Sequence, residues 1–273
     1  MLKQRVLTAI LLAPLAIAGV LGLSTPWFAL ALGAVCAAGL VEWARLVGLR
    51  SLPSQLALAA VNVGLMLLLW FWPQRDEALR IEMFLGVAWW PLAALWLRHY
   101  SFGQALARRN QGIKALAGCL IVVPAWAAGV LLHGGSPAGP RWVLFVLVLI
   151  WCADVFAFFF GRRFGTTKLA PRVSPGKTRA GLYGALLGSA LYAAVAGVAL
   201  GHTHGTLFVL VLLSVVTVGV SVIGDLFESL IKRHSNVKDS GNIFPGHGGV
   251  LDRLDSLFAA LPVFVAGKLL FQL

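Results

Sequence analysis

The sequence predicts an all-α, polytopic integral membrane protein with about nine transmembrane helices and a cytoplasmic N-terminus. Apolar residues make up 59% of its 273 residues and charged residues only 12%, whereas soluble domains carry about 25% charged residues. Apolar stretches of about 18 to 25 residues, the length that crosses ~30 Å of hydrocarbon, recur along the whole chain. Only short polar stretches separate them, so we expect a single membrane domain over residues 1–273.

The expected spans are nine apolar stretches, at residues 6–23, 27–46, 54–73, 82–97, 113–133, 142–161, 180–200, 206–230 and 250–271. The first follows Lys3 and Arg5, as in a signal peptide, but it continues for a full membrane thickness without a convincing cleavage site, so we keep it as a span. The stretch 82–97 is short enough to be tilted, re-entrant or merged with its flanks. The ten tryptophans lie mostly near span ends and are predicted to anchor the helices at the interfaces.

The distribution of basic residues predicts the orientation. With the N-terminus inside, 18 of the 22 lysines and arginines fall on the inner side. The four on the outer side are Arg75, Arg80, Arg141 and Lys268. This imbalance places the N-terminus in the cytoplasm and the C-terminus outside. It also explains the net charge of +12 through topology and anionic headgroups, so we expect no nucleic-acid partner.

Residues 229–255, SLIKRHSNVKDSGNIFPGHGGVLDRLD, are rich in charge and glycine and lie between two apolar runs. We expect the functional site here, at the membrane surface. Residues 225–232, which overlap the start of this segment, place four polar residues on one helix face, at i, i+3, i+4 and i+7. They are Asp225, Glu228, Ser229 and Lys232. An acid at membrane depth costs about 2.5 to 3.5 kcal/mol, so the two acids need a cation, a proton or water. The alternative is local pairing with Lys232 or Arg233.

The ninth stretch opens with GGVLDRLDS, in which Asp252 and Asp255 share a face of the first helical turns. Acids at a helix N-terminus are also common as dipole partners, and this alternative stays open for Asp255. The loop 232–249 returns the chain to the membrane face it left, so we expect Asp225 and Asp252 to approach each other. Two carboxylates beside phosphate-binding groups make a hard oxygen-ligand site suited to Mg²⁺.

The turn from Pro245 to Gly249 is rich in glycine and leads into a helix. The backbone N–H groups of such a turn can form a nest for phosphate oxygens. Basic residues flank the turn and are expected to clamp phosphate. They are Lys232, Arg233, Lys238 and Arg253.

Two features upstream extend the candidate site. Asp154 lies inside the sixth stretch and is either satisfied by a neighbouring Ser or the backbone, or contacts substrate or metal. The basic loop after it contains SPGKT at 174–178, which lacks the spacing and the preceding strand of a Walker A loop. Lys177 and Thr178 can still bind a triphosphate as a point charge and a hydroxyl, although a purely topogenic loop is the competing interpretation.

Together these residues resemble one family closely. The pattern S-x-x-K-R-x4-K-D-x-G-x3-P-G-H-G-G-x2-D-R-x-D runs unbroken from Ser229 through Asp255. It is similar to the signature of the phosphatidate cytidylyltransferases, also called CDP-diacylglycerol synthases. The resemblance extends to GDLFES around Asp225, to SPGKT, and to a D-x-x-A-[YF]-x-x-G-R pattern from Asp154 to Arg162. It covers roughly the C-terminal half, while the first five spans match only in hydrophobic character.

The resemblance implies transfer of CMP from CTP to phosphatidate, which releases pyrophosphate and forms CDP-diacylglycerol for phospholipid biosynthesis. It implies dependence on Mg²⁺, with K⁺ as a candidate second cation, and a homodimer surrounded by membrane lipid. The expected location is a bacterial-type cytoplasmic (inner) membrane, with the active site facing the cytosol. Residues 1–135 would then form N-terminal helices, and 142–273 the catalytic helices and cytoplasmic loops.

Carried onto matching positions, the resemblance implies that Asp225 and Asp252 are metal ligands. Further candidate ligands are Asp154, Glu228 and Asp255. The candidate catalytic residues are Asp225, Asp252, Lys232, Arg233 and Arg253. The candidate residues for binding substrate and phosphate are Ser174, Lys177, Thr178, Ser229, Lys238, Asp239, Gly246, His247, Gly248 and Gly249. The chain departs from the usual family pattern at Arg179 and Ala180, where many members have an aromatic residue and then Glu or Gln, and at Phe158, where Tyr is common.

Two other functions fit part of the pattern. Intramembrane acids also mark ion pathways in ion-coupled transporters, but a transporter predicts polar residues spread over several spans and related halves. A CTP-dependent lipid kinase would share the nucleotide and transfer its γ-phosphate to a lipid alcohol.

Overall fold

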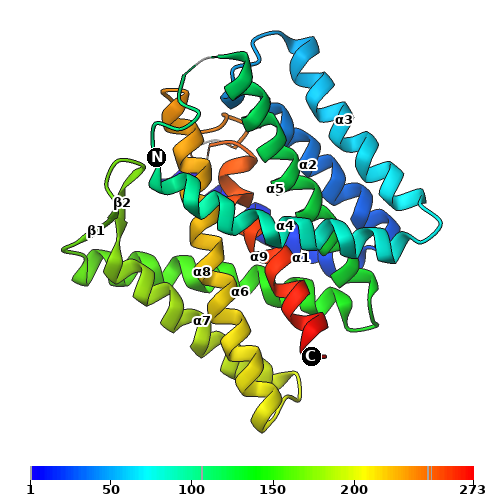
Figure 1. Cartoon of the computed structure of the whole chain (residues 1–273). Coiled ribbons are helices and arrows are strands. Elements are labelled where there is room, and N and C mark those ends of the chain that lie inside the picture. The colour runs from blue at the N-terminus through cyan, green and yellow to red at the C-terminus, as the bar shows by residue number, and fades with distance from the viewer. Residues whose placement is uncertain (1, 106, 245, 247) are drawn as a thin grey trace.

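The computed structural model describes residues 2–105, 107–244, 246 and 248–273, and only the backbone of residues 2–9. Within these residues the chain forms nine helices and two short strands (Figure 1). The helices are α1 (Leu2–Gly22), α2 (Thr25–Val47), α3 (Leu52–Phe71), α4 (Arg75–Arg98), α5 (Arg108–Gly134), α6 (Gly139–Phe164), α7 (Arg179–Ala199), α8 (His204–His234) and α9 (Leu251–Leu270). The strands are β1 (Lys168–Ala170) and β2 (Ser174–Thr178).

Each helix overlaps one of the predicted apolar stretches. Seven of the described helices, α2 to α8, are long and apolar enough to cross a membrane, so the chain is an integral membrane protein. The described apolar part of α1 is shorter, Ile10–Gly22, and α9 carries charged residues in its first turns. The short fourth stretch is a full helix of 24 residues, because α4 begins at Arg75 with Asp76 and Glu77 in its first turn, where acids favour the helix dipole.

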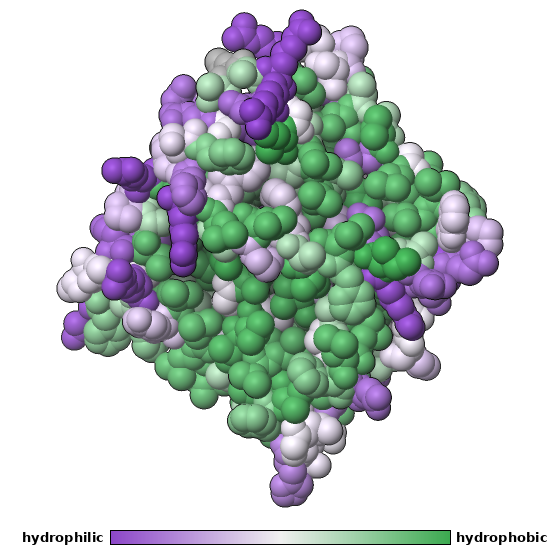
Figure 2. Space-filling view, in the orientation of Figure 1, coloured by the Kyte–Doolittle hydropathy of each residue, from purple (hydrophilic) through white to green (hydrophobic). Residues whose placement is uncertain are grey.

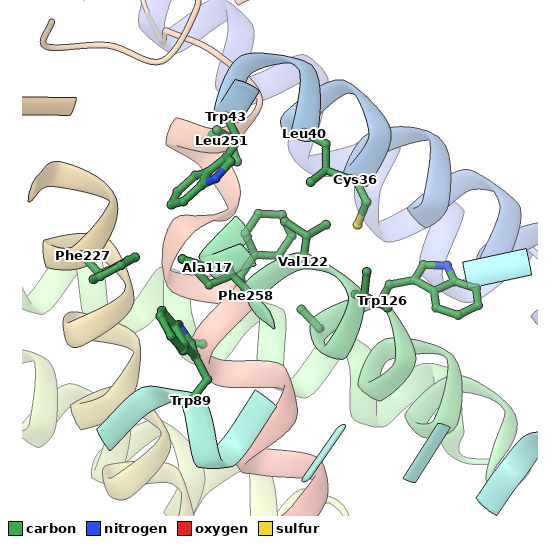
Figure 3. Packing of buried hydrophobic residues seen from close by; sticks show 14 of the residues in the cluster. Cys36, Leu40, Trp43, Trp89, Ala117, Val122, Trp126, Phe227, Leu251 and Phe258 are labelled. Carbon is green, nitrogen blue, oxygen red and sulfur yellow. The ribbon is translucent and has the colours of Figure 1, made fainter. Parts of the chain in front are cut away.

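Helix α5 lies at the centre of the N-terminal part and packs against α2, α4 and α9. Aromatic side chains fill the space around it, and Figure 3 shows Trp43, Trp89 and Phe227 converging there from three different helices. Six of the ten tryptophans are buried. They are Trp43, Trp89, Trp90, Trp96, Trp126 and Trp142. The prediction that most tryptophans anchor the interfaces was therefore wrong, because their large apolar area packs between helices instead.

Glycines allow α6 and α7 to pack closely. Gly184 and Gly188 of α7 face Phe156 and Phe160 of α6, and a Cβ at Gly184 would lie 2.5 Å from the Cβ of Phe160. Helices in lipid gain little from hydrophobic burial against one another, so small residues that permit close backbone approach decide where they pack.

The basic loop after α6 differs from the all-helical expectation. Strands β1 and β2 pair antiparallel as a small hairpin, and the SPGKT segment is itself strand β2. Thr178 ends this strand and caps α7, since its Oγ1 accepts a hydrogen bond of 3.1 Å from Gly181 N. A Walker A loop lies between a strand and a helix, whereas here the segment is the strand, so the rejection of that assignment agrees with the structure.

The surface shows where lipid contacts the protein. Figure 2 shows a broad apolar surface, with polar side chains gathered at the top, at the left near the hairpin, and at the right and bottom of the molecule. Large apolar side chains such as Val61, Val195 and Phe208 are exposed on their helices. Exposed apolar side chains at this density indicate a surface solvated by lipid tails.

Candidate active site

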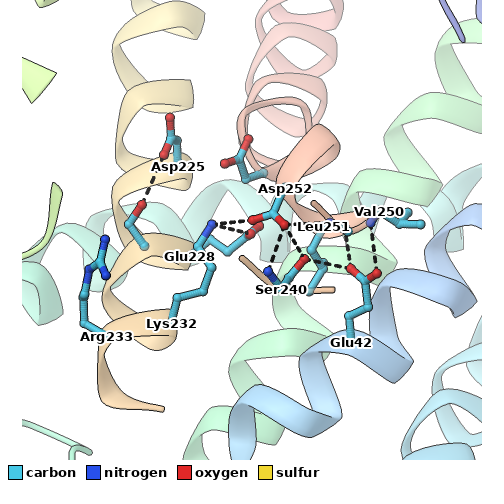
Figure 4. A network of polar contacts seen from close by, with 12 residues as sticks. Glu42, Asp225, Glu228, Lys232, Arg233, Ser240, Val250, Leu251 and Asp252 are labelled. Atoms are coloured by element: carbon cyan, nitrogen blue, oxygen red, sulfur yellow. Dashed lines mark hydrogen bonds and ion pairs between the residues drawn. The ribbon is translucent and has the colours of Figure 1, made fainter. Parts of the chain in front are cut away.

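Helices α8 and α9 pack against each other and bring their acidic faces together (Figure 4). The ammonium of Lys232 lies 3.1 Å from Glu228 Oε1 on its own helix and 2.7 Å from Asp252 Oδ1 on α9. Glu228 and Lys232 are 4% and 8% exposed. The local pairing weighed for the acids of α8 therefore holds for Glu228, but the same lysine also binds the acid of the next helix. The loop 235–250 returns the chain to the same end of the bundle, as expected.

Asp225 has a different partner. Lys177 of β2 forms an ion pair with Asp225 Oδ2, and Ser229 Oγ donates a hydrogen bond of 3.4 Å to Asp225 Oδ1. The contact with Ser229 confirms the predicted i, i+4 placement on α8. The ion pair joins the hairpin to α8, so the SPGKT segment and GDLFES, which are remote in sequence, meet at one carboxylate.

A cavity of about 580 Å³ opens beside this ion pair, between α6, α7, α8 and the hairpin. Its polar lining includes Asp154, Lys177 and Asp225, together with Arg162 and Lys168. Within the described residues, the Asp154 carboxylate accepts no hydrogen bond and forms no ion pair. The cavity therefore combines two acids with several cations beside apolar helix walls, which suits a ligand with a charged head and an apolar tail.

Asp252 is held in place by both of its oxygens. While Oδ1 faces Lys232, Oδ2 accepts hydrogen bonds from Ser240 N and Gly249 N, each at 2.8 Å, and lies 2.9 Å from Ser240 Oγ. Gly248 adopts a φ of +82°, and a Cβ there would collide with Asp252 Oδ2. Glycine is therefore required at this position both by the left-handed backbone and by the close carboxylate.

Glu42 of α2 is a site residue that sequence reasoning missed. It is 1% exposed, and its carboxylate accepts hydrogen bonds from Val250 N and Leu251 N, each at 3.0 Å, and from Ser240 Oγ at 2.8 Å. Figure 4 shows Glu42 reaching from α2 to the start of α9. The available signal was the cost of an acid inside the second apolar stretch, where Glu42 is the only acidic residue.

Several backbone amides in and beside the glycine-rich turn already have partners within the protein. Phe244 N donates a hydrogen bond of 2.9 Å to Gly248 O and so narrows the turn. The amides of Gly249, Val250 and Leu251 are bonded to the carboxylates of Asp252 and Glu42. Gly246 has a φ of +76°, and His247 lies outside the described residues. The expected phosphate nest stays a prediction, and the amides after the turn bind carboxylates in this structure.

The other candidates fall into two groups. Arg233 Nε donates to Val173 O at 3.1 Å and so ties the end of α8 to the hairpin. Asp255 accepts a hydrogen bond of 2.6 Å from Ser256 N. Ser174 is half-buried, and Lys238, Asp239 and Arg253 are exposed. Within the described residues, none of these three charged side chains forms an ion pair.

The acids fit a hard metal ion by donor type. Within the described part of the chain, no group of three or more Asp, Glu, His or Cys side chains is gathered as a ligand set. Asp225 and Asp252 each form an ion pair with the ammonium of a lysine, so each carboxylate already binds a cationic group. Carboxylate oxygens are the ligands that Mg²⁺ prefers, and these two acids remain the candidates to hold it.

Comparison with known proteins identifies relatives along the whole chain. The sequence model of the cytidylyltransferase family matches residues 3–271. A phosphatidate cytidylyltransferase of Pseudomonas aeruginosa is 44% identical over 269 residues, which cover 97% of this chain and 96% of that protein. One of Haemophilus influenzae is 39% identical over 285 aligned positions, 97% of each chain.

These matches correct the expectation that similarity is confined to the C-terminal half. Both alignments include the N-terminal helices, among them α2, which supplies Glu42. A shorter match, to a phosphatidate cytidylyltransferase of Staphylococcus epidermidis, is 38% identical over 58% of this chain and 61% of that protein. The family match spans nearly every residue from the first helix to the last. The chain therefore belongs to the cytidylyltransferase family.

Proposed function

We propose that this chain transfers CMP from CTP to phosphatidate, forming CDP-diacylglycerol and pyrophosphate for phospholipid biosynthesis. The observation that carries the proposal is the full-length similarity to two proteins named phosphatidate cytidylyltransferase. The site supports it, because a cavity with acids and basic side chains lies beside lipid-facing helices. A soluble nucleotide and a lipid headgroup can both reach such a position.

The chemistry requires positioning more than proton transfer. A phosphate oxygen of phosphatidate forms a bond to the α-phosphorus of CTP, and the bond from that phosphorus to the oxygen that bridges to the β-phosphate breaks, so that pyrophosphate leaves. The nucleophile is already an anion, so no strong general base is needed. Lys177, Arg162 and Lys168 line the cavity and would orient the phosphates and offset the charge on the leaving group.

We further propose Mg²⁺ as the metal, held by Asp225 and Asp252, with Asp154, Glu228 and Asp255 as further candidate ligands. Bound there, Mg²⁺ would neutralise phosphate charge and polarise the reacting phosphoryl group. Two acids that already hold a cation support a cationic ligand, because the ammonium of Lys232 lies 3.1 Å from Glu228 Oε1 and 2.7 Å from Asp252 Oδ1. K⁺ as a second cation and a homodimer are proposed from the family resemblance alone.

We propose nine spans in a bacterial inner membrane, with the N-terminus and the site on the cytoplasmic side. Seven of the helices in the described part of the chain have the length and hydropathy expected of spans. If α1 and α9 are counted as well, the number of spans is odd, and the two termini lie on opposite sides of the membrane. The hairpin lies at the end of the bundle where α8 leads into the loop 235–250, since Arg233, in the last turn of α8, donates a hydrogen bond to Val173 O of the hairpin. Their basic residues favour the cytoplasmic side.

Product analysis tests the reaction. Purified protein in lipid-containing detergent is incubated with Mg²⁺, phosphatidate and CTP labelled at the α-phosphate or in the base. A labelled lipid and an equal amount of pyrophosphate are expected. Release of CDP with a lipid acceptor would support a CTP-dependent lipid kinase, and the absence of any phosphatidate-dependent product would contradict the proposal.

A further inference from the structure

The N-terminal half contributes one buried acid to the site. The two oxygens of Glu42 accept three hydrogen bonds from residues more than 190 positions away, Ser240, Val250 and Leu251. Within the described residues Glu42 makes no ion pair. Burying a carboxylate costs free energy unless hydrogen-bond donors surround it. Glu42 finds these donors only because α2 packs against the start of α9.

Glu42 takes the place of a missing helix cap. Val250, the residue before α9, makes no side-chain cap hydrogen bond, and the first amides of a helix have no partner within it. The carboxylate of Glu42 binds two of these amides and places negative charge at the positive end of the helix. The first turn of α9, which carries Asp252, is therefore fixed by a side chain from α2.

The surrounding glycines leave room for this carboxylate. A Cβ at Gly241 would collide with Glu42 Oε1, and a Cβ at Gly249 would collide with both oxygens of Glu42 and with Ser240 Oγ. Gly249 is not one of the glycines with a positive φ. Its lack of a side chain thus serves the close approach of Glu42 rather than the backbone conformation.

Ser240 joins Glu42 to Asp252. Its hydroxyl lies 2.8 Å from Glu42 Oε2 and 2.9 Å from Asp252 Oδ2. A serine hydroxyl has a single proton, so the two carboxylates compete for one donor, and the orientation of the hydroxyl depends on both. A change at Glu42 therefore alters the hydrogen bonding of Asp252 without touching it.

We propose that Glu42 is a positioning residue, which fixes Asp252 through Ser240 and through the first turn of α9. The proposal rests on the proposed function, because it assigns Glu42 to the same site. Partners of this kind, which orient a functional carboxylate, typically change activity by about 10-fold to 100-fold when altered. We expect Glu42→Gln to reduce kcat by that factor, with less effect on the KM for CTP.

The experiment compares Glu42→Gln, Ser240→Ala and the double variant with wild type. Ser240→Ala keeps the two amide hydrogen bonds of Glu42 and so tests the relay even if Glu42→Gln folds poorly. Hydrogen exchange of a peptide covering 248–256 reports on the first turn of α9, and faster exchange is expected in Glu42→Gln only. If Glu42 acts through Ser240, the losses in kcat are not multiplicative, and the double variant resembles Glu42→Gln.

Asn62→Leu is the matched control. Asn62 is 1% exposed on α3, and its amide donates only within its own helix, to Leu58 O at 2.8 Å. This variant should keep wild-type kcat and exchange. Wild-type kcat in Glu42→Gln, or fully multiplicative losses, would overturn the proposal. A wild-type protein without CMP transfer would instead contradict the proposed function, so the two failures are distinguishable.

Discussion

The ammonium of Lys232 lies 2.7 Å from Asp252 Oδ1 and thereby joins α8 to α9. The same ammonium lies 3.1 Å from Glu228 Oε1, one helical turn earlier on α8. One buried cation thus offsets acids from two helices. Removing the charge of Lys232 would leave both buried carboxylates without this cationic partner. A substitution at Lys232 is therefore a sensitive test of the site.

Lys232→Met is expected to lower stability and to abolish activity. Breaking a buried ion pair on one side costs about 3 to 5 kcal/mol, because the remaining charge is buried without compensation. The thermal unfolding midpoint in detergent measures the loss. Arg75→Gln is the control, since Arg75 pairs with Asp76 at an exposed site where a pair is worth about 0 to 1 kcal/mol. Equal midpoints for the two variants would contradict the role of Lys232.

Asp225→Asn is expected to abolish CMP transfer while the protein stays folded. Asp225 and Lys177 are about one quarter exposed, at 26% and 27%, so loss of their ion pair should change stability by only about 1 kcal/mol after solvent screening. The measurement is lipid-linked CMP together with gel filtration in detergent. Asp76→Asn, in the exposed pair with Arg75, should keep full activity. Substantial transfer by Asp225→Asn would remove this residue from the proposed metal site.

Gly249→Ala is expected to destabilise the start of α9 by about 1 to 3 kcal/mol, the usual cost of overpacking. The added Cβ collides with Glu42 and Ser240, so activity should fall as well. Gly64→Ala in α3 is the matched control, because a Cβ there meets nothing within 4 Å and alanine is favoured over glycine in a helix by about 0.5 to 1 kcal/mol. Unfolding midpoints of the two variants should therefore move in opposite directions.

The proposed orientation predicts which loops are accessible from outside the cell. In a background without Cys36, Cys119 and Cys152, a membrane-impermeant maleimide should label Ser136→Cys, between α5 and α6, in intact cells. It should label Ser101→Cys, between α4 and α5, only after the membrane is permeabilised. The reverse pattern would show that the basic loops face outward and would contradict the assignment based on positive charge.

Much of the fold could be predicted because membrane helices have a strong local signal. A run of apolar residues is read from composition and length alone, and all nine described helices overlap predicted stretches. The exceptions are informative. Helix α4 extends beyond its apolar part because Asp76 and Glu77 support its first turn, and the β1–β2 hairpin depends on pairing between two short segments with weak individual preferences.

The candidate site was predictable only where its contacts follow helix geometry. The spacing of Asp225 from Ser229, and of Glu228 from Lys232, placed each pair one turn apart, and both contacts are present. The partners from other elements were not predictable. Nothing in the local pattern specifies that Lys177 meets Asp225 or that Glu42 meets Ser240.

By itself, the sequence determined that the chain enters a membrane, how its helices divide the chain, and which polar segment carries the chemistry, because apolar length, charge asymmetry and one-turn spacing are local quantities. Only the tertiary structure decided that Glu42 from α2 binds the first amides of α9, that each of two acids faces a lysine, and that glycines leave space for these contacts. The physical reason is that a buried carboxylate needs several donors at hydrogen-bond distance, and such donors come from whichever segments the helix packing brings together.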